Sequence, residues 1–426
     1  MRGYDSWDDR HATMKSSSIF RESSEKSERW MVTNKGRLSP FLLSSLCITL
    51  FFTGFFVYHQ NPLISDQNFL TLQPQIDPEC DLFKGHWVPD KRGSLYTNSS
   101  CSTLPDSKNC IKHGRLDRDF LFWRWKPDGC NLPRFNPKAF LGMVRGKKMS
   151  FIGDSVARNH MESLLCLLSM EETPKDIYKD GEDRNRIWYF PNHDFTLSTS
   201  WTKFLVEEHE RVDGNKTGTG LFDIDISKMD EGWSKGLPNI DIAIVSAAHW
   251  FFRPIFIHRG DETLGCIYCN VPNMTQLSPD QGFKLVYASV FKHINECENC
   301  KRDLVTVMRT ISPAHFENGA WDTGGSCRRT SPFGVNQIDL QSTEMKIRTS
   351  QIEQLEVVTK RDHHKGKKKF GVLDVTRVML MRPDGHPNSH WGNKWMKGYN
   401  DCVHWCLPGP IDTWSEFLMA ILRQLR

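Results

Sequence analysis

The feature that most constrains this chain is a single uncharged apolar segment near its N-terminus. Residues 41–58 read FLLSSLCITLFFTGFFVY. A helix of about 18 apolar residues is just long enough to cross a bilayer. Lys35 and Arg37 precede the segment, whereas residues 60–79 contain no Lys or Arg. The positive-inside rule therefore predicts a membrane helix at 41–58 with the rest of the chain in the lumen. Because no convincing cleavage site follows, we interpret it as an uncleaved signal anchor.

The cysteine content agrees with a lumenal body. The chain has 13 cysteines, and all but Cys47 follow the apolar segment. The twelve cysteines after the segment are an even number, and in an oxidising compartment this predicts disulfides. Glycosylation sequons begin at Asn98, Asn215 and Asn273, although each triplet alone is weak evidence. The net charge is only +4 and forms no basic stripe, so the sequence does not predict nucleic-acid binding.

Composition divides the chain into five parts. Residues 1–40 are polar and rich in Ser and charge, which predicts a disordered cytosolic tail before the membrane helix at 41–58. Residues 59–79 form a polar stem. Residues 80–140 hold four cysteines among Gly, Pro and Asn turns, and a region of this kind depends on disulfides for its shape. Residues 141–426 make up the remaining, larger globular part.

An alternation of strands and helices begins after residue 147. Short apolar strands are expected at 148–153, 241–246, 304–308 and 370–374, and helices at 156–168, 281–296, 335–360 and 412–425. Such alternation favours an α/β fold with a parallel sheet covered on both faces. Residues 185–206 are expected to add antiparallel strands.

The first chemical motif is Gly153-Asp154-Ser155, between a predicted strand and a predicted helix. A serine there stands at the carboxyl edge of the sheet and at the positive end of the helix. Backbone N–H groups at this point can stabilise an oxyanion. By itself the motif is weak evidence and favours helix capping without catalysis, because Asp and Ser are common N-caps.

The second motif is Asp401-Cys402-Val403-His404. Residues three apart lie on one face of a helical turn, so Asp401 can accept the Nδ1 proton of His404 and leave Nε2 as a base. A serine after the first strand and a histidine after the last can converge on one sheet edge. Because serine needs a nearby imidazole to become a good nucleophile, the two motifs together predict a Ser155–His404–Asp401 triad.

Taken with further segments, these motifs resemble the trichome birefringence-like family of plant polysaccharide O-acetyltransferases, which is similar to SGNH/GDSL esterases. The nucleophile motif continues with Arg158 and Asn159. The other matching segments are CDLFKGHW at 80–87, WKPDGC at 125–130, SPAHF at 312–316, WDTGGSC at 321–327, RPDGH at 382–386 and DCVHWCLPGPID at 401–412. The resemblance extends from Cys80 to the C-terminus and implies an SGNH-hydrolase-like fold, with residues 141–426 as the SGNH/GDSL-like catalytic domain.

The resemblance assigns roles to the matching positions. It implies that Ser155 is the nucleophile, His404 the base and Asp401 the residue that orients it. Asp154 and Arg158 flank the nucleophile. Arg158 is a candidate oxyanion or substrate contact, with a surface ion pair as the alternative.

The oxyanion hole departs from the pattern of SGNH enzymes, which often place an Asn after a later strand. Residues 246–253 read SAAHWFFR and contain no Asn. The side chain of His249 and a backbone N–H are the two candidates for the missing donor.

The resemblance also implies a disulfide pattern. The expected bonds are Cys80–Cys130, Cys101–Cys166, Cys110–Cys406 and Cys327–Cys402. Cys266-x-x-Cys269 and Cys297-x-x-Cys300 remain. Two further disulfides are favoured over a zinc ribbon in an oxidising lumen, so no metal site is expected.

The function implied is acetyl transfer, through an acetyl-serine, to hydroxyls of a hemicellulose of the plant cell wall. Residues 250–254 and 265–269 look most like family members that act on glucomannan or xyloglucan. No cofactor is expected to be bound; the acetyl donor is expected to be acetyl-CoA or a carrier derived from it. The expected location is the Golgi membrane, single-pass, with the catalytic domain in the lumen. A polysaccharide acetylesterase and a non-catalytic wall polysaccharide-binding protein are the alternatives.

Tryptophans are the candidate sugar-stacking side chains, although most tryptophans in proteins belong to the core. The candidates are Trp123, Trp125, Trp250, Trp321, Trp391 and Trp405.

Overall fold

The computed structural model describes residues 80–362, 368–392 and 398–426. The predicted tail, membrane span and stem at 1–40, 41–58 and 59–79 lie outside these residues. Within the described ranges, no helix has both the length and the apolar character needed to cross a bilayer.

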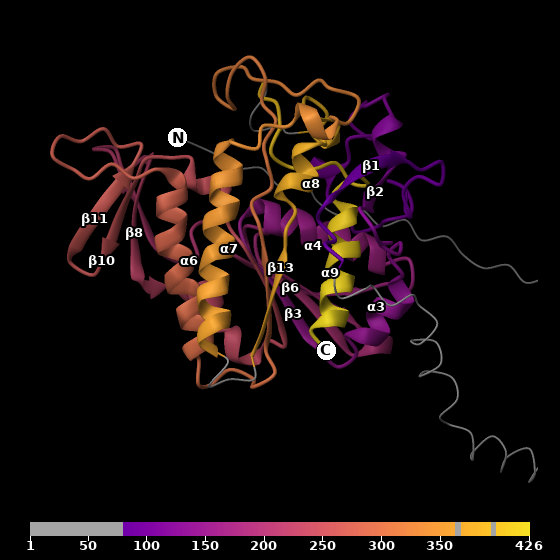
Figure 1. Ribbon diagram of the computed structural model, residues 1–426, viewed down its shortest axis with the longest axis horizontal. Helices are drawn as coiled ribbons and strands as arrows, with labels where there is room; N and C mark the ends of the chain where they lie inside the picture. The colour runs from indigo at the N-terminus through magenta and orange to yellow at the C-terminus, as the bar shows by residue number, and fades with distance from the viewer. Residues whose placement is uncertain (1–79, 363–367, 393–397) are drawn as a thin grey trace, which may run out of the picture. The chain divides into compact units, whose positions relative to one another are not determined.

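A seven-stranded mixed sheet forms the centre of the described unit (Figure 1). From edge to edge its strands are β13 (Lys369–Leu373), β12 (Val305–Arg309), β9 (Ile242–Ser246), β3 (Lys148–Gly153), β6 (Phe195–Trp201), β5 (Arg186–Phe190) and β4 (Lys175–Lys179). The strands from β13 to β6 are parallel, whereas β5 is antiparallel to β6 and β4 to β5. The predicted parallel sheet is therefore confirmed in its core. Residues 185–206 are only partly antiparallel, because β6 runs parallel to β3.

Helices cover both faces of this sheet, and Figure 1 shows the two groups on opposite sides of it. One group is α3 (Pro137–Met143), α4 (Ser155–Leu168) and α9 (Asp412–Gln424), and the other is α6 (Pro279–Glu296) and α7 (Thr343–Asp362). The sequence of β3 explains this arrangement, because successive side chains of a strand point to opposite faces. Phe151 is buried in the core cluster of α4 and α9, and the next residue, Ile152, in that of α6 and α7.

The long helix α7 begins later than predicted. It starts at Thr343, whereas Val335–Gln337 forms only a short 3₁₀ turn. Local hydrogen bonding accounts for the difference: the Asp339 carboxylate accepts the N–H of Gln341 at 2.8 Å, a turn that competes with helix formation. The expectation of a helix from Val335 is therefore wrong at its N-terminal end.

A second sheet, which the sequence reading did not predict, lies on the far side of α6 from the central sheet (Figure 1). Its order is β11 (Glu262–Ile267), β10 (Ile255–Arg259), β8 (Gly218–Met229) and β7 (Val206–Val212). Only β8 and β10 are parallel neighbours. Phe222, Ile224 and Ile257 are buried from this sheet in the same core cluster as α6. The short helices α5 (Glu231–Ser234) and α8 (Thr376–Leu380) complete the α-helices of the described ranges.

The cysteine-rich region contains a small antiparallel sheet of β1 (Gly85–Pro89) and β2 (Trp123–Pro127). Trp87 and Trp125 are directly opposite each other, with ring centroids 5.7 Å apart in an edge-to-face arrangement. Such aromatic pairs stabilise neighbouring strands. Two of the candidate sugar-stacking tryptophans, Trp125 and Trp405, are buried in the hydrophobic core.

The structure contains all four disulfides that the resemblance implied. They are Cys80–Cys130, Cys101–Cys166, Cys110–Cys406 and Cys327–Cys402. The two Cys-x-x-Cys motifs each close on themselves, as Cys266–Cys269 and Cys297–Cys300. The four cysteines of these motifs therefore form two further disulfides, which was the favoured alternative, and not a zinc ribbon.

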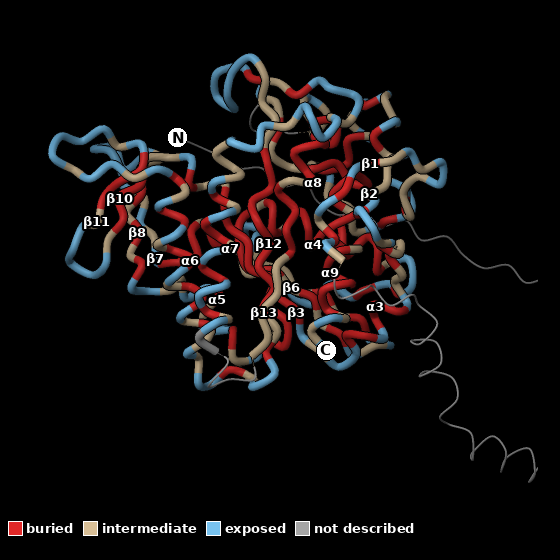
Figure 2. The backbone as a smooth tube through the Cα atoms, in the orientation of Figure 1, coloured by how far each residue is buried: buried red, intermediate tan, exposed pale blue. Residues whose placement is uncertain are grey.

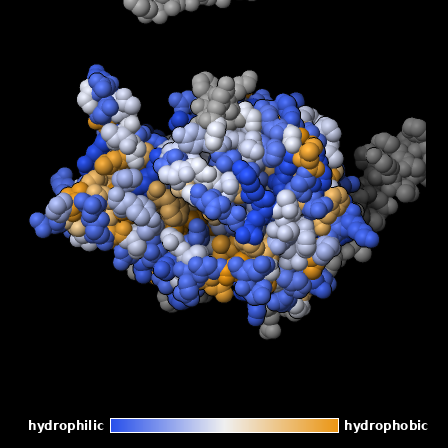
Figure 3. Space-filling view, turned by 90° about the horizontal axis from the view of Figure 1, so that it is seen from above, coloured by the Kyte–Doolittle hydropathy of each residue, from blue (hydrophilic) through white to orange (hydrophobic). Residues whose placement is uncertain are grey.

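Buried residues concentrate in the strands and on the inner faces of the helices, and exposed residues in the connecting loops (Figure 2). Hydrophilic residues predominate on the face that Figure 3 shows, with smaller hydrophobic groups between them. Asn215 and Asn273 are exposed and Asn98 is partly exposed. Glycosylation at these three sequons stays a prediction.

Candidate active site

Ser155 is the first residue of α4, and only Asp154 separates it from Gly153, the last residue of β3. The close packing of the chain at this point requires a glycine at 153. A Cβ atom on Gly153 would lie 1.6 Å from the carbonyl oxygen of Ser246 on β9, and its φ is +154°. Glycine alone permits this close approach of two backbones. The sequence thus places the serine at the carboxyl edge of the sheet, as predicted.

Asp154 holds this turn in place. It is the N-cap of α4, and its Oδ1 accepts the N–H of Val156 at 2.9 Å. Its Oδ2 accepts the N–H groups of Ala248 and His249, at 2.8 and 3.1 Å, from the loop after β9. Burial alone would raise the pKa of Asp154, but the contact with His249 and the guanidinium of Arg309 lower it well below its usual range. Asp154 is therefore an ionised anchor between two loops.

His404 and Asp401 come from the loop before α9, and the structure brings them to Ser155 across 249 residues of chain. The Nε2 atom of His404 lies 2.8 Å from the Oγ of Ser155. The Nδ1 atom lies 2.9 and 3.1 Å from the two carboxylate oxygens of Asp401. Because a carboxylate can only accept, Nδ1 carries the proton and Nε2 is free to accept one from the serine hydroxyl. This is the geometry of an activated nucleophile.

Asp401 is held from several directions. Its Oδ1 accepts the backbone N–H groups of Val403 and His404, at 3.2 and 2.9 Å. Lys108, from the cysteine-rich region, places its Nζ 3.6 Å from Oδ2. Burial would raise the pKa of Asp401, but His404 and the ammonium of Lys108 hold it far below its usual range. Lys108 was absent from the predicted site residues.

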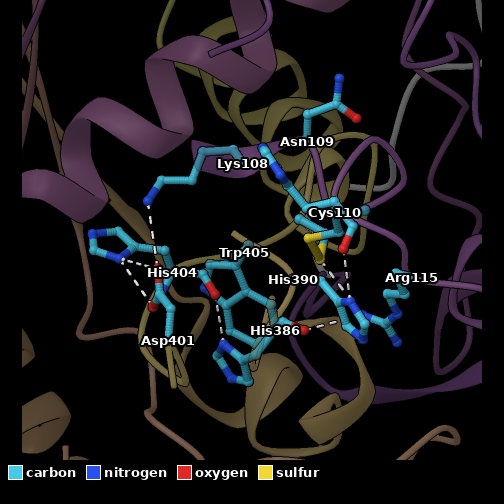
Figure 4. The surroundings of a disulfide bond; sticks show 12 residues. Lys108, Asn109, Cys110, Arg115, His386, His390, Asp401, His404 and Trp405 are labelled. Atoms are coloured by element: carbon cyan, nitrogen blue, oxygen red, sulfur yellow. Dashed lines mark hydrogen bonds and ion pairs between the residues drawn. A yellow bond between two sulfur atoms is a disulfide. The ribbon is translucent and has the colours of Figure 1, made fainter. Parts of the chain in front are cut away.

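His386 and His315 support the catalytic loop from behind rather than competing with His404 for the serine. The Nδ1–H of His386 donates to the carbonyl oxygen of His404 at 2.7 Å, and His386 Nε2 lies 2.7 Å from Nδ1 of His315. The His386 ring also packs on Trp405, with centroids 4.0 Å apart (Figure 4). Burial lowers the pKa of both histidines, that of His315 to about 4. Both side chains therefore lie away from the solvent and position the loop from behind.

Two predicted oxyanion or substrate contacts have other partners in the structure. Arg158 donates to Glu162 at 2.7 Å and pairs with Asp183, which matches the ion-pair alternative. His249 borders the cavity beside Ser155, but its Nε2–H donates to the carbonyl oxygen of Ser312 at 3.0 Å. Backbone N–H groups at the start of α4 are therefore the better candidates for the oxyanion hole.

A cavity of about 440 Å³ opens beside Ser155 and His404. Most of its apolar wall consists of aromatic side chains, which are Trp250, Phe252, Phe316, Trp321, Trp391 and Tyr399. Three of the candidate sugar-stacking tryptophans thus line it. Arg253 also borders the cavity, 4.7 Å from the ring of Trp250 and 5.4 Å from that of Trp321, and has no ion pair within the described ranges. A cavity of this size and composition suits a small organic ligand or a few sugar units.

Metal ligands are not clustered in the part of the chain that the structure describes: no group of three or more His, Cys, Asp or Glu side chains is placed to hold an ion.

Comparison with known proteins agrees with this geometry. Residues 132–421 match PC-Esterase, the GDSL/SGNH-like acyl-esterase family found in Pmr5 and Cas1p, and residues 78–131 match the PMR5 N-terminal domain. The chain is 83% identical over 414 residues to xyloglucan O-acetyltransferase 2 of Arabidopsis thaliana, covering 96% of this chain and 99% of the relative.

More distant relatives extend the comparison. Xyloglucan O-acetyltransferase 4 of Populus trichocarpa is 53% identical over 407 residues, covering 94% of this chain and 95% of the relative. Protein trichome birefringence-like 19 of Arabidopsis thaliana is 39% identical over 378 residues, covering 87% of each chain. The chain therefore belongs to the trichome birefringence-like family, within the GDSL/SGNH-like acyl-esterases.

Proposed function

We propose that this protein is an acyltransferase that transfers an acetyl group to hydroxyls of xyloglucan. The observation that carries the proposal is the contact of 2.8 Å between Ser155 Oγ and His404 Nε2, with Asp401 behind the imidazole. Relatives at 83% and 53% identity bear the name xyloglucan O-acetyltransferase. Of the two acceptors that the sequence left open, they favour xyloglucan over glucomannan.

The geometry supports a double displacement through one nucleophile. His404 Nε2 takes the proton of Ser155, and Oγ attacks the acetyl carbonyl carbon of the donor. The resulting oxyanion is stabilised at the N-terminus of α4. The carbonyl carbon then releases the leaving group of the donor, which receives the proton from His404, and an acetyl-serine remains. A sugar hydroxyl gives its proton to His404 and attacks this ester, which restores the serine and yields the sugar acetate.

Transfer rather than hydrolysis requires that the sugar hydroxyl reacts faster than water. The aromatic wall of the cavity supports this outcome, because Trp250, Trp321 and Trp391 offer flat apolar faces on which sugar rings can stack. A hydroxyl held in attacking geometry gains a high effective concentration over water.

The acetyl donor is proposed to be acetyl-CoA or an anionic carrier derived from it. Xyloglucan itself provides no anion to pair with Arg253, which borders the cavity without an ion pair in the described residues. A guanidinium binds phosphate groups through paired hydrogen bonds. The guanidinium lies near the rings of Trp250 and Trp321, which also border the cavity, so it is placed beside a ligand bound there.

The location is proposed to be the Golgi membrane, with the described unit in the lumen. The support comes from the sequence: the uncharged segment at 41–58, the basic residues before it, and the even number of cysteines after it. The anchor itself lies outside the described residues.

The test is a labelling assay with the full-length protein in detergent. With isotopically labelled acetyl-CoA and xyloglucan oligosaccharides, label is expected on the sugar, and without the acceptor a Ser155 peptide should carry the acetyl mass. Ser155→Ala should lose both signals. Release of acetate without labelled sugar would identify an acetylesterase. A Ser155→Ala protein that still restores wall acetylation in a deficient plant would identify a binding protein instead.

A further inference from the structure

We propose that Lys108, a residue of the cysteine-rich region, is a positioning residue of the catalytic site: it fixes the Asp401 carboxylate and keeps His404 available as a base. The inference rests on the proposed function, because it assigns His404 that role. Its basis is the ion pair between Lys108 Nζ and Asp401 Oδ2 at 3.6 Å (Figure 4). The Lys108 side chain is only 10% exposed and that of Asp401 only 4%.

The backbone around Lys108 is attached directly to the catalytic loop. The Lys108 carbonyl oxygen accepts the N–H of Leu407 at 2.9 Å. Two residues later, Cys110 forms a disulfide with Cys406, two residues after His404. Two independent links therefore fix the backbone at Lys108 beside the catalytic loop, so its side chain begins close to Asp401. In Figure 4, Lys108 reaches from the cysteine-rich region toward Asp401, with the disulfide on the other side of Trp405.

A buried lysine requires a compensating anion. In the part of the chain that the structure describes, Asp401 is the carboxylate within 4 Å of Lys108. His404 Nδ1 lies 3.1 Å from Oδ1 and 2.9 Å from Oδ2 of Asp401, and each oxygen has further partners. Oδ1 also accepts backbone N–H groups of its own loop, whereas Oδ2 also faces Lys108. These contacts hold the carboxylate in the orientation that aims His404 Nε2 at the serine.

Lys108 also changes the charge that His404 experiences. Lys108 Nζ lies 3.6 Å from the carboxylate oxygen that faces His404 Nδ1, so its positive charge offsets part of the negative charge beside the imidazole ring. Other titratable groups also face this loop and the cavity: His386 through the His404 carbonyl, His315 behind it, and His249, Asp154 and Glu344 on the other elements. Of these, none forms an ion pair with Lys108.

The inference gives the N-terminal region a chemical task in addition to a structural one. Residues 78–131 match a separate family domain from the esterase-like residues 132–421. Lys108 and Cys110 place part of that domain within the surroundings of the catalytic acid–base pair. The esterase-like domain therefore holds the nucleophile and base, and the N-terminal domain completes their support.

The experiment compares pH profiles of the full-length protein. Lys108→Met should lower kcat/KM for acetyl transfer by about 10- to 100-fold, an effect as large as that of removing the residue that orients a metal-binding histidine. The acidic limb of the pH profile of this variant should move toward higher pH by about one unit, while its KM for xyloglucan stays unchanged. Lys108→Arg, which keeps the charge, should restore the wild-type limb. The matched control is Lys301→Met, because Lys301 also pairs with a largely buried aspartate, Asp241, at 2.8 Å.

A second readout does not depend on the acceptor or the donor. The rate at which a fluorophosphonate probe modifies Ser155, measured by mass spectrometry across pH, should show the same displacement in Lys108→Met. If the acidic limb of Lys108→Met stays where it is in the wild type, and its loss of thermal stability equals that of Lys301→Met, Lys108 is merely structural. Failure of the wild-type protein to label xyloglucan would instead contradict the proposed function, and the probe would still decide the role of Lys108.

Discussion

Asp401 illustrates how much of the site depends on single atoms. Both of its oxygens face the His404 ring; one also accepts backbone N–H groups, and the other also faces Lys108. An amide in place of the carboxylate would keep the shape but could donate to Nδ1 and thereby stabilise the wrong tautomer of His404.

Asp401→Asn should therefore lower kcat by ~10³–10⁴-fold with little change in KM for the acceptor. Steady-state kinetics of acetyl transfer give the measurement. Asp223→Asn is the control, because Asp223 pairs with Arg211 on the second sheet, and its activity should match wild type. A kcat within tenfold of wild type for Asp401→Asn would contradict the assigned role.

A second prediction at the scale of single residues concerns Gly153. Gly153→Ala forces a Cβ to 1.6 Å from the Ser246 carbonyl oxygen, so β3 and β9 must separate beside the nucleophile. We expect a loss of at least about 1–3 kcal/mol in the free energy of unfolding, with a loss of activity. Gly142→Ala in helix α3 is the control, because its Cβ would meet nothing within 4 Å. Chemical denaturation of both variants tests this, and equal stabilities would refute it.

Sequence patterns identify the residues of the triad but not those that support it. Asp401 and His404 are three residues apart, and Ser155 follows a clear strand, so local spacing reveals both halves. Lys108 belongs to no such pattern, because it meets Asp401 only through the fold. The Cys110–Cys406 pair implied by the resemblance was the one hint that this region lies beside the catalytic loop. Arg158 stands next to the nucleophile motif in sequence, yet it points to Glu162 and Asp183.

At the scale of elements, α9 carries an acidic pair on its buried side. Burial raises the pKa of Asp412 and of Glu416 to about 7 each. Position in the first turn of a helix would favour the ionised form of Asp412, but removal from water has the larger effect. Tyr96 and Ser163 donate to Asp412 at 2.9 and 2.6 Å, and the N–H of Phe135 donates to Glu416 at 3.3 Å.

Stability should consequently fall as pH rises across this window. For Glu416 the unfolded chain loses its proton near the ordinary value of 4.5, while the folded chain keeps it until about 7. The folded state binds more protons in between, so the free energy of unfolding decreases with pH there and is level above it. Glu416→Gln should be more stable than wild type at pH 8, by about 1–3 kcal/mol, and not at pH 4. Thermal melts at both pH values test this; an equal gain at both would contradict it.

Elements with strong apolar patterns were predictable, and those with weak patterns were not. The strands β3, β9 and β12 are short buried runs, and their positions agree with the expectation. β7 reads VEEHERV, and its charged residues conceal the strand pattern, so the second sheet was missed. This sheet depends on packing against α6, which no local pattern in β7 reveals. The start of α7 was also misplaced, because the turn at Asp339 interrupts an otherwise helical composition.

At the scale of the whole molecule, the N-terminal region and the catalytic loop are joined by Cys110–Cys406, which closes 296 residues. Cys297–Cys300 offers a contrast, since it spans three residues. Long loops lose more chain entropy on closure in the unfolded state, so the long-range disulfide should contribute more to stability.

The double variant Cys110→Ser/Cys406→Ser should lose about 2–5 kcal/mol in the free energy of unfolding and much of its acetyl transfer, because Lys108 and Asp401 are no longer braced together. Cys297→Ser/Cys300→Ser is the matched control and should retain activity with a smaller loss. Calorimetry and the labelling assay provide the measurements. Similar losses in both variants would show that the link between the two regions has no special role.

The same long disulfide has a consequence for how the enzyme is made. Cys110 is synthesised 296 residues before its partner Cys406, so this disulfide cannot form until the catalytic loop has been made. The base, its orienting carboxylate and the sulfur that secures them lie close together in the sequence and therefore leave the ribosome together, long after Ser155. A nascent chain that still lacks residues 401–406 has the nucleophile without its base and cannot transfer acetyl groups.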